Sequence, residues 1–191
     1  MTDETASKVF SADIANLAEY ARGLGDRIAS APDRFLKLVI AVTMLSFTLV
    51  KLTGDANHGD MEKVLDQYGV ALSIIYGLVA LIGVLLIFEL VRSRYHYIAI
   101  IRYNNILRSD AFRVLQLNTL GHHIWTDHDI RLWPWDSAST FAFAAVVVVT
   151  ATITWLSVYA STKSCLWASS GGALVIGISV AASWHVNKKL A

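Results

Sequence analysis

The sequence predicts an all-α protein: an integral membrane four-helix bundle with an amphipathic N-terminal cytoplasmic helix, whose second span extends into the cytoplasm as a helical stalk. Three observations predict this class. Four apolar stretches approach the length of a bilayer. Hydrophobic residues make up 55% of the chain and charged residues only 16%, whereas charged residues are about a quarter of a soluble domain. Acidic and basic residues are also segregated between successive connections.

The four predicted transmembrane helices cover residues 35–52, 70–91, 139–160 and 165–185. About 20 apolar residues are needed to cross roughly 30 Å of hydrocarbon as a helix. The last three segments have this length with no charge in the middle. The first is shorter between Lys37 and Lys51, so either both ammonium groups reach toward the two membrane surfaces or the bilayer thins around this helix.

The charges of the connections predict the topology. The segment 53–69, between the first two spans, is acidic and is expected outside. The segment 92–138 carries six arginines and the tail 186–191 two lysines, and the N-terminal region 1–34 carries Lys8, Arg22, Arg27 and Arg34; all three are expected in the cytoplasm. This alternation follows the positive-inside rule for an even number of spans. We therefore expect an integral protein of the bacterial plasma (inner) membrane with both termini cytoplasmic.

The N-terminal region carries an apolar face at helical spacing. Its members are Phe10, Ile14, Leu17, Ala21, Leu24 and Ile28. A face of this kind buries against a partner. The candidates are the cytoplasmic stalk of the same chain, the lipid headgroup layer and a neighbouring subunit, and we expect the stalk to be one partner. Pro32 precedes the first span and is expected to mark a boundary at which a new helix begins.

The stalk is expected because no turn signal follows the second span until Gly121. Glu89 near the end of that span is expected to pair with Arg92, three residues away on one helix face. Asn105 and Arg108 lie in the apolar stripe of the stalk. They either form hydrogen bonds with carboxylates and fix the register of packing, or point to solvent.

One cluster has residue types suited to a metal: His122, His123, Asp127 and His128, in the segment GHHIWTDHD. Imidazoles and carboxylates bind zinc, iron or manganese. However, the segment has no zincin signature, and no second histidine cluster of the kind found in membrane di-iron enzymes is present. We expect a polar loop at the membrane surface and no cofactor; a divalent metal here is the alternative.

Other enzyme signatures are missing from the sequence. It contains neither a Gly-rich phosphate loop nor a G-x-S-x-G elbow. No acidic or basic residue lies in the middle of a predicted span, which argues against a proton-coupled transporter. The arginines of segment 92–138 alternate with apolar residues rather than forming a phosphate-tracking face, so we expect no nucleic-acid partner.

Two stripes in the last spans indicate helix association. Small residues recur every four positions at Ser169, Ala173, Gly177 and Ala181; we call these four residues the small-residue ridge. Such ridges let helix backbones approach closely in lipid, either within one bundle or between subunits. A hydroxyl stripe follows Thr150, Thr154 and Ser157 in the preceding span. Its hydroxyls either bond within their helix or line a narrow polar pathway.

These features predict a non-enzymatic, self-associating four-span membrane protein. It would act as a small pore-forming or permeabilising protein, or as a scaffold or accessory subunit of a larger membrane complex. The expected partners are the lipid bilayer and either copies of the same chain or other membrane subunits. The alternative function is a membrane-bound metalloenzyme that acts on lipid or quinone through the His/Asp-rich loop.

Overall fold

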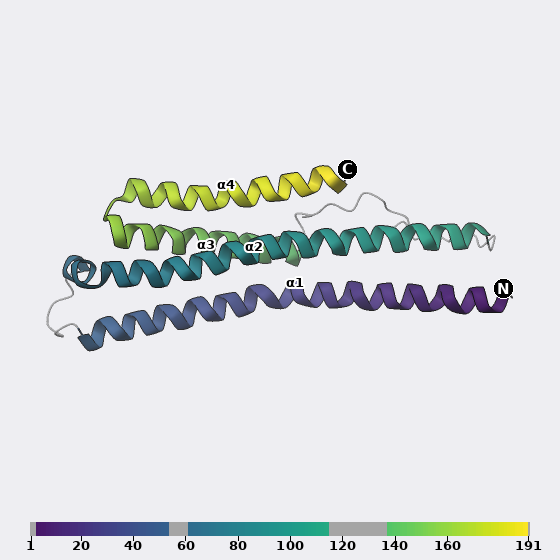
Figure 1. The fold of residues 1–191 in the computed structure, drawn as a ribbon, viewed down its shortest axis with the longest axis horizontal. Helices are drawn as coiled ribbons and strands as arrows, with labels where there is room; N and C mark the ends of the chain where they lie inside the picture. The colour runs from purple at the N-terminus through teal and green to yellow at the C-terminus, as the bar shows by residue number, and fades with distance from the viewer. Residues whose placement is uncertain (1–2, 54–60, 115–136, 191) are drawn as a thin grey trace.

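The computed structural model describes residues 3–53, 61–114 and 137–190, and all regular structure within these ranges is helical. The helices are α1 (Asp3–Thr53), α2 (Met61–Val114), α3 (Ala138–Thr162) and α4 (Cys165–Leu190) (Figure 1). The all-α prediction is therefore confirmed for the described part of the chain.

Three segments of these helices are long and apolar enough to cross a membrane: Tyr68–Leu107 of α2, Ala138–Thr162 of α3 and Cys165–Lys189 of α4. The protein is thus compatible with membrane insertion. The predicted first span, residues 35–52, is not among the three, and some of its side chains lie outside the described residues. A fourth span stays a prediction.

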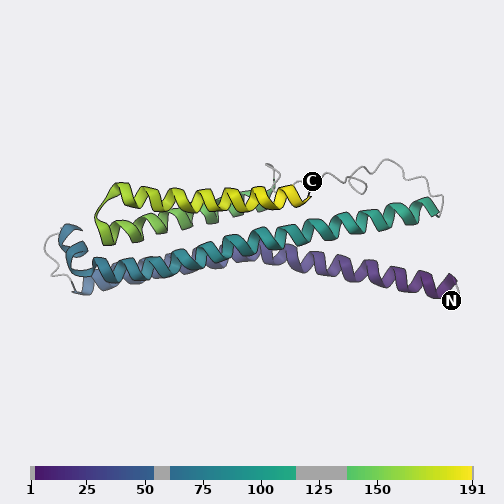
Figure 2. The ribbon, with the colours of Figure 1, turned by 45° about the horizontal axis from the view of Figure 1, so that its top comes forward.

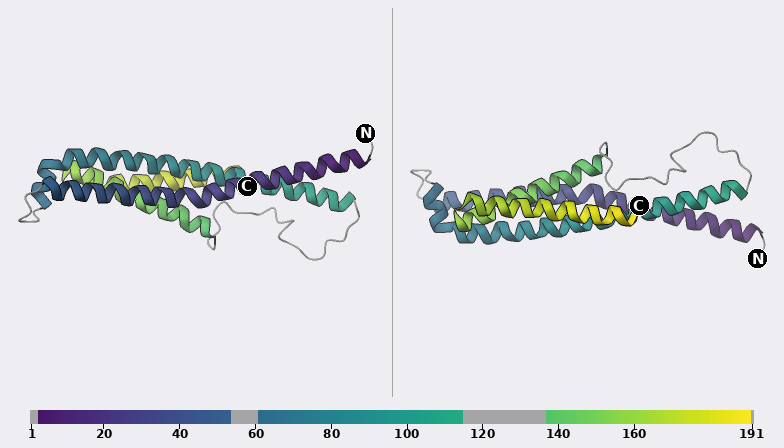
Figure 3. Two further views of the ribbon diagram at one scale, coloured as in Figure 1. Left: turned by 90° about the horizontal axis from the view of Figure 1, so that it is seen from below. Right: turned by 90° about the horizontal axis from the view of Figure 1, so that it is seen from above.

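The four helices run antiparallel to their neighbours in the chain, and both ends of the chain point toward the same end of the molecule (Figure 1). Helices α2 and α3 contact each other most extensively and form the middle of the bundle. Helix α1 packs on one side of them and α4 on the other. The first part of α1 and the last part of α2 continue beyond the ends of α3 and α4. These two helices cross near the end of α4 (Figure 3).

This two-helix extension corresponds to the predicted stalk and N-terminal helix. Leu24 and Ile28 of α1 are buried, as is Ile98 of α2. A Cβ added to Gly25 would lie 3.8 Å from the ring of Tyr97, so α1 and α2 are in contact there. The apolar face of the N-terminal region therefore packs on the stalk of the same chain.

The predicted helix boundary at Pro32 is wrong. Helix α1 continues through this proline for 51 residues. A proline inside a helix removes one backbone hydrogen bond and commonly bends the helix, and Figure 2 shows α1 bending part-way along its length. The helix nevertheless persists, because Ile28 and Phe35, on either side of the proline, are both buried against the bundle.

Three glycines of α2 bring it close to α3. A Cβ at Gly69 would fall 2.6 Å from the carbonyl oxygen of Ala160, and one at Gly77 would lie 3.3 Å from Oγ of Ser157. A Cβ at Gly83 would collide with Thr150 and would lie 2.8 Å from the ring of Phe35 on α1. Glycine is therefore required where α1, α2 and α3 meet.

Local signals set the ends of α3. The hydroxyl of Ser137 accepts a hydrogen bond from the backbone N–H of Thr140 at 3.3 Å, as an N-cap does. At the other end Lys163 has φ 54°, and its N–H donates to the carbonyl of Tyr159 at 2.8 Å. This left-handed residue reverses the chain within two residues, so α4 returns directly along α3.

Two helices are longer than the predicted spans. Helix α2 begins at Met61, inside the predicted outer loop 53–69. The sequence from Met61 to Tyr68 contains no proline or glycine that would break a helix. Helix α4 continues to Leu190 and includes Lys188 and Lys189, which suit its negative end. Most of the predicted tail 186–191 is therefore helical.

Candidate functional site

The small-residue ridge of α4 lies on the outside of the bundle. Ser169, Ala173, Gly177 and Ala181 are all exposed. A Cβ added to Gly177 would meet no atom within 4 Å. Within the described part of the chain, no helix covers this ridge, so the same-chain packing considered from the sequence does not occur in this structure.

A different face of α4 holds it in the bundle. Ala168, Gly172, Val175 and Ser179 are buried. A Cβ at Gly172 would lie 3.3 Å from the carbonyl oxygen of Ala151, which shows close backbone contact with α3. The glycine pair 171–172 was the sequence signal for this face. The four-residue repeat of the ridge instead indicated the opposite face of α4 as a packing surface.

The hydroxyl stripe of α3 lies within the packed helices. Thr150 is fully buried and its hydroxyl donates to the carbonyl of Val146 at 2.7 Å. Thr154 donates in the same way to the carbonyl of Thr150 at 2.8 Å. Ser157 instead donates across to the carbonyl of Ser73 on α2, at 2.8 Å. In this arrangement Ser157 joins α3 to α2, and the hydroxyls of Thr150 and Thr154 are used within α3.

The predicted contacts of the N-terminal face are present where side chains are described. Leu24 is buried, and Ile14 and Leu17 are half-buried. The side chain of Phe10 lies outside the described residues. The described part of this face is therefore partly buried within the chain, most completely at Leu24.

The three predicted register residues differ in their surroundings. Asn105 is 5% exposed, and no hydrogen-bond partner for its Nδ2 is found in the described part of the chain. Glu89 is exposed and accepts a hydrogen bond from Ser93 at 3.2 Å. The expected ion pair between Glu89 and Arg92 does not form among the described side chains. The side chain of Arg108 lies outside them.

The candidate metal ligands cannot be placed. His122, His123, Asp127 and His128 lie in the segment 115–136, outside the described residues. Within the described residues, no group of three or more histidine, cysteine, aspartate or glutamate side chains is arranged to hold a metal ion.

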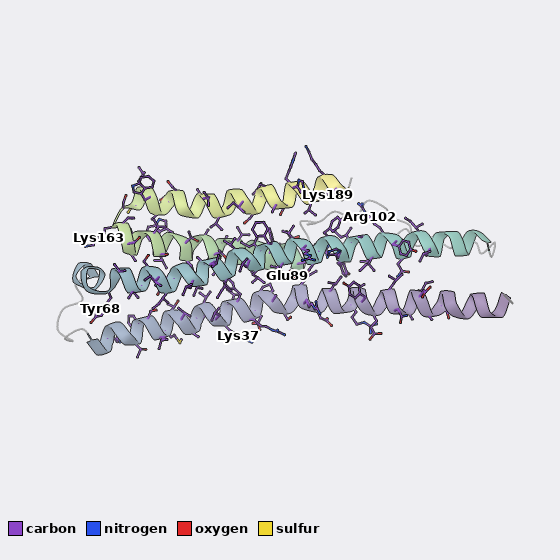
Figure 4. All side chains as sticks on the ribbon, viewed as in Figure 1. Lys37, Tyr68, Glu89, Arg102, Lys163 and Lys189 are labelled. Atoms are coloured by element: carbon purple, nitrogen blue, oxygen red, sulfur yellow. The ribbon has the colours of Figure 1, made fainter. Side chains whose placement is uncertain are left out.

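Sequence reasoning missed a groove between α1 and α2. Its volume is about 400 Å³, and its walls include Arg27, Arg34, Leu38, Ile82 and Glu89. The available signal was the seven-residue spacing of the two arginines, which places them on one face of α1. Figure 4 shows Glu89 part-way along the bundle, far from Tyr68 and Lys163 at one end of it.

Comparison with protein families, curated proteins and solved structures finds no match to this chain.

Proposed function

We propose that the protein is a self-associating membrane scaffold or accessory subunit, in which the small-residue ridge of α4 joins the bundle to a second copy or to another membrane subunit. The observation that carries this proposal is the exposure of the whole ridge, although another face of α4 already packs on α3. A lipid-facing helix has no need of such a ridge, because lipid tails solvate large aliphatic side chains equally well.

The packing inside the bundle supports this role for small residues. Helices α2 and α3 approach where glycines face small hydroxylated residues, as at Gly77 and Ser157. The ridge presents serine, alanine and glycine in the same manner to the outside. Large exposed residues, including Leu174 at 63% and Val180 at 63% exposure, flank it. A partner helix could therefore fit between them and contact the α4 backbone.

The pore-forming version of this proposal receives less support. Its expected lining, the hydroxyl stripe of α3, is occupied by hydrogen bonds within α3 and to α2. Opening a pathway there would require α2 and α3 to separate at their closest contact. The scaffold or subunit function needs no such rearrangement. Nothing in the described residues favours the metalloenzyme alternative.

The test is the native mass of the protein in nanodiscs, compared with that of a double variant, Ala173→Leu with Gly177→Leu. The wild-type protein should be a dimer or larger, or should co-purify with a stoichiometric membrane partner. The double variant should weaken that association at least about ten-fold, which corresponds to roughly 1.4 kcal/mol, because the added side chains hold the helices apart.

A matched control is Ala41→Leu, on the exposed surface of α1, on the opposite side of the bundle from α4 (Figure 1). It adds the same side chain to an exposed position and should leave the association unchanged. A wild-type protein that is strictly monomeric and carries no partner would contradict the proposal. Equal effects of the control and the ridge variant would also contradict it.

A further inference from the structure

The groove between α1 and α2 changes in polarity along its length. At one end its walls are apolar and include Leu38, 37% exposed, and Ile82, 46% exposed. Toward the other end the lining residues include Arg27, Arg34 and Glu89. From residue 27 to residue 38 a helix rises about 16 Å, which is enough for a lipid headgroup and the beginning of an acyl chain.

The polar end lies where a membrane surface is expected. Ile82 and Glu89 both belong to the apolar segment Tyr68–Leu107 of α2, and Glu89 is its first charged residue. Figure 4 places Glu89 part-way along the bundle, far from the end that carries Tyr68 and Lys163. The groove therefore runs from the apolar part of α2 to the level of the first charged residue of this segment.

The charges at the polar end favour an anionic ligand. Lys37 is engaged by Asp33 in an ion pair of 2.7 Å. Neither Arg27 nor Arg34 forms an ion pair with a side chain in the described ranges. With Glu89 the groove has one net positive charge, which complements one phosphodiester. Glu89 also keeps a place for hydrogen-bond donors of a headgroup, because among the described residues only Ser93 is bonded to it, at 3.2 Å.

We propose that this groove binds one anionic phospholipid. Its phosphate would lie between Arg27 and Arg34, hydroxyl groups of the headgroup would donate to Glu89, and one acyl chain would lie along Leu38, Ile82 and Leu86. Arginine suits this role because its planar group forms paired hydrogen bonds with phosphate oxygens. The site lies on α1 and α2 and is separate from the ridge of α4.

The experiment uses the full-length protein in nanodiscs of equal parts phosphatidylglycerol and phosphatidylcholine. Native mass spectrometry then counts the lipids that each subunit retains. The wild-type protein should retain one phosphatidylglycerol in preference to phosphatidylcholine. The double variant Arg27→Gln with Arg34→Gln should bind phosphatidylglycerol roughly twenty-five-fold more weakly, from about five-fold for each basic residue near an anionic headgroup.

The matched control is Lys188→Gln with Lys189→Gln, which removes the same charge from the exposed end of α4. It should leave the retained lipid unchanged. A third variant, Ala31→Leu, fills the groove without changing charge and should reduce retention of the lipid as well. Circular dichroism and thermal unfolding identify any variant that has lost its fold, and the remaining variants decide the test.

Three results would overturn the proposal. One is equal loss of lipid in the arginine variant and in the lysine control, which would mean that binding reflects net charge alone. Another is equal retention of phosphatidylcholine by the wild-type protein. The third is that Ala31→Leu changes the number of subunits but leaves the amount of bound lipid unchanged. That result would identify a second copy of the chain as the occupant of the groove. The same spectra report the number of subunits. A failure of the ridge proposal can therefore be distinguished from a failure of the lipid proposal.

Discussion

Gly83 of α2 lies directly against Thr150 of α3, whose hydroxyl is bonded back to its own helix at Val146. The ring of Phe35 from α1 reaches the same point. Three helices thus meet at a position where only hydrogen fits on α2. This junction sets how closely the central helices of the bundle approach each other.

The first prediction is that Gly83→Ala destabilises the bundle by about 1–3 kcal/mol, the usual cost of adding atoms to a packed core. The new methyl group would overlap both Thr150 and Phe35. The measurement is thermal unfolding in nanodiscs. Gly23→Ala on α1 is the control, because a Cβ there meets nothing within 4 Å. It should stabilise α1 by up to about 1 kcal/mol; similar destabilisation by both changes would disprove the packing argument.

The second prediction concerns the hydrogen bond from Ser157 to the carbonyl of Ser73, 84 residues earlier in the chain. Ser157→Ala should lower stability by about 0.6 kcal/mol, the average for hydrogen bonds between helices in a membrane protein, and by no more than about 1.7 kcal/mol. Thr152→Val is the comparison, since the exposed hydroxyl of Thr152 bonds only within α3. It should change the unfolding temperature little. An unchanged midpoint for Ser157→Ala would mean that this bond contributes nothing to holding the two helices together.

The third prediction is that Asn105→Leu stabilises the two-helix extension. Asn105 is buried, and its Nδ2 lacks a partner among the described residues. An unsatisfied buried polar atom costs about 1–3 kcal/mol, so a leucine of similar size should raise the unfolding temperature. Asn105→Asp should lower it by placing a charge in the same buried position. Destabilisation by leucine would instead show that the amide bonds to a group outside the described residues.

The sequence predicted the helical class and the long helices because these depend on apolar length and on the absence of helix breakers. It also identified Leu24 and Ile28 as an apolar face, and the structure buries both. Local periodicity is sufficient for such predictions. The contact between that face and the extension of α2 followed from the same reasoning.

The sequence could not decide which side of a helix faces inward when several small-residue faces compete. On α4 both the ridge at Gly177 and the face at Gly172 are compatible with close packing, and only the structure shows that Gly172 is the one in contact with α3. Likewise, the groove at Arg27 and Arg34 depends on how α1 lies on α2. That relationship joins residues far apart in the chain.

At Pro32 the sequence predicted a helix boundary from a strong local signal, and packing overrides that signal. Its ring is buried while the helix continues on both sides. We expect Pro32→Ala to stabilise the protein, because proline in a helix interior costs about 3 kcal/mol relative to alanine. Loss of the buried ring would offset this only in part, by about 1–2 kcal/mol on the scale of a buried apolar side chain.

The net gain from Pro32→Ala should therefore be about 1–2 kcal/mol, read from the unfolding temperature in nanodiscs. A reciprocal variant tests the same reasoning. Ala29 is exposed on α1, and Ala29→Pro should cost about 3 kcal/mol or more. If Pro32→Ala destabilises the protein, the bend in α1 is itself required for packing on α2. The bent form would then be the one that the bundle selects, since a straight α1 would lose the contacts of Ile28 or those of Phe35.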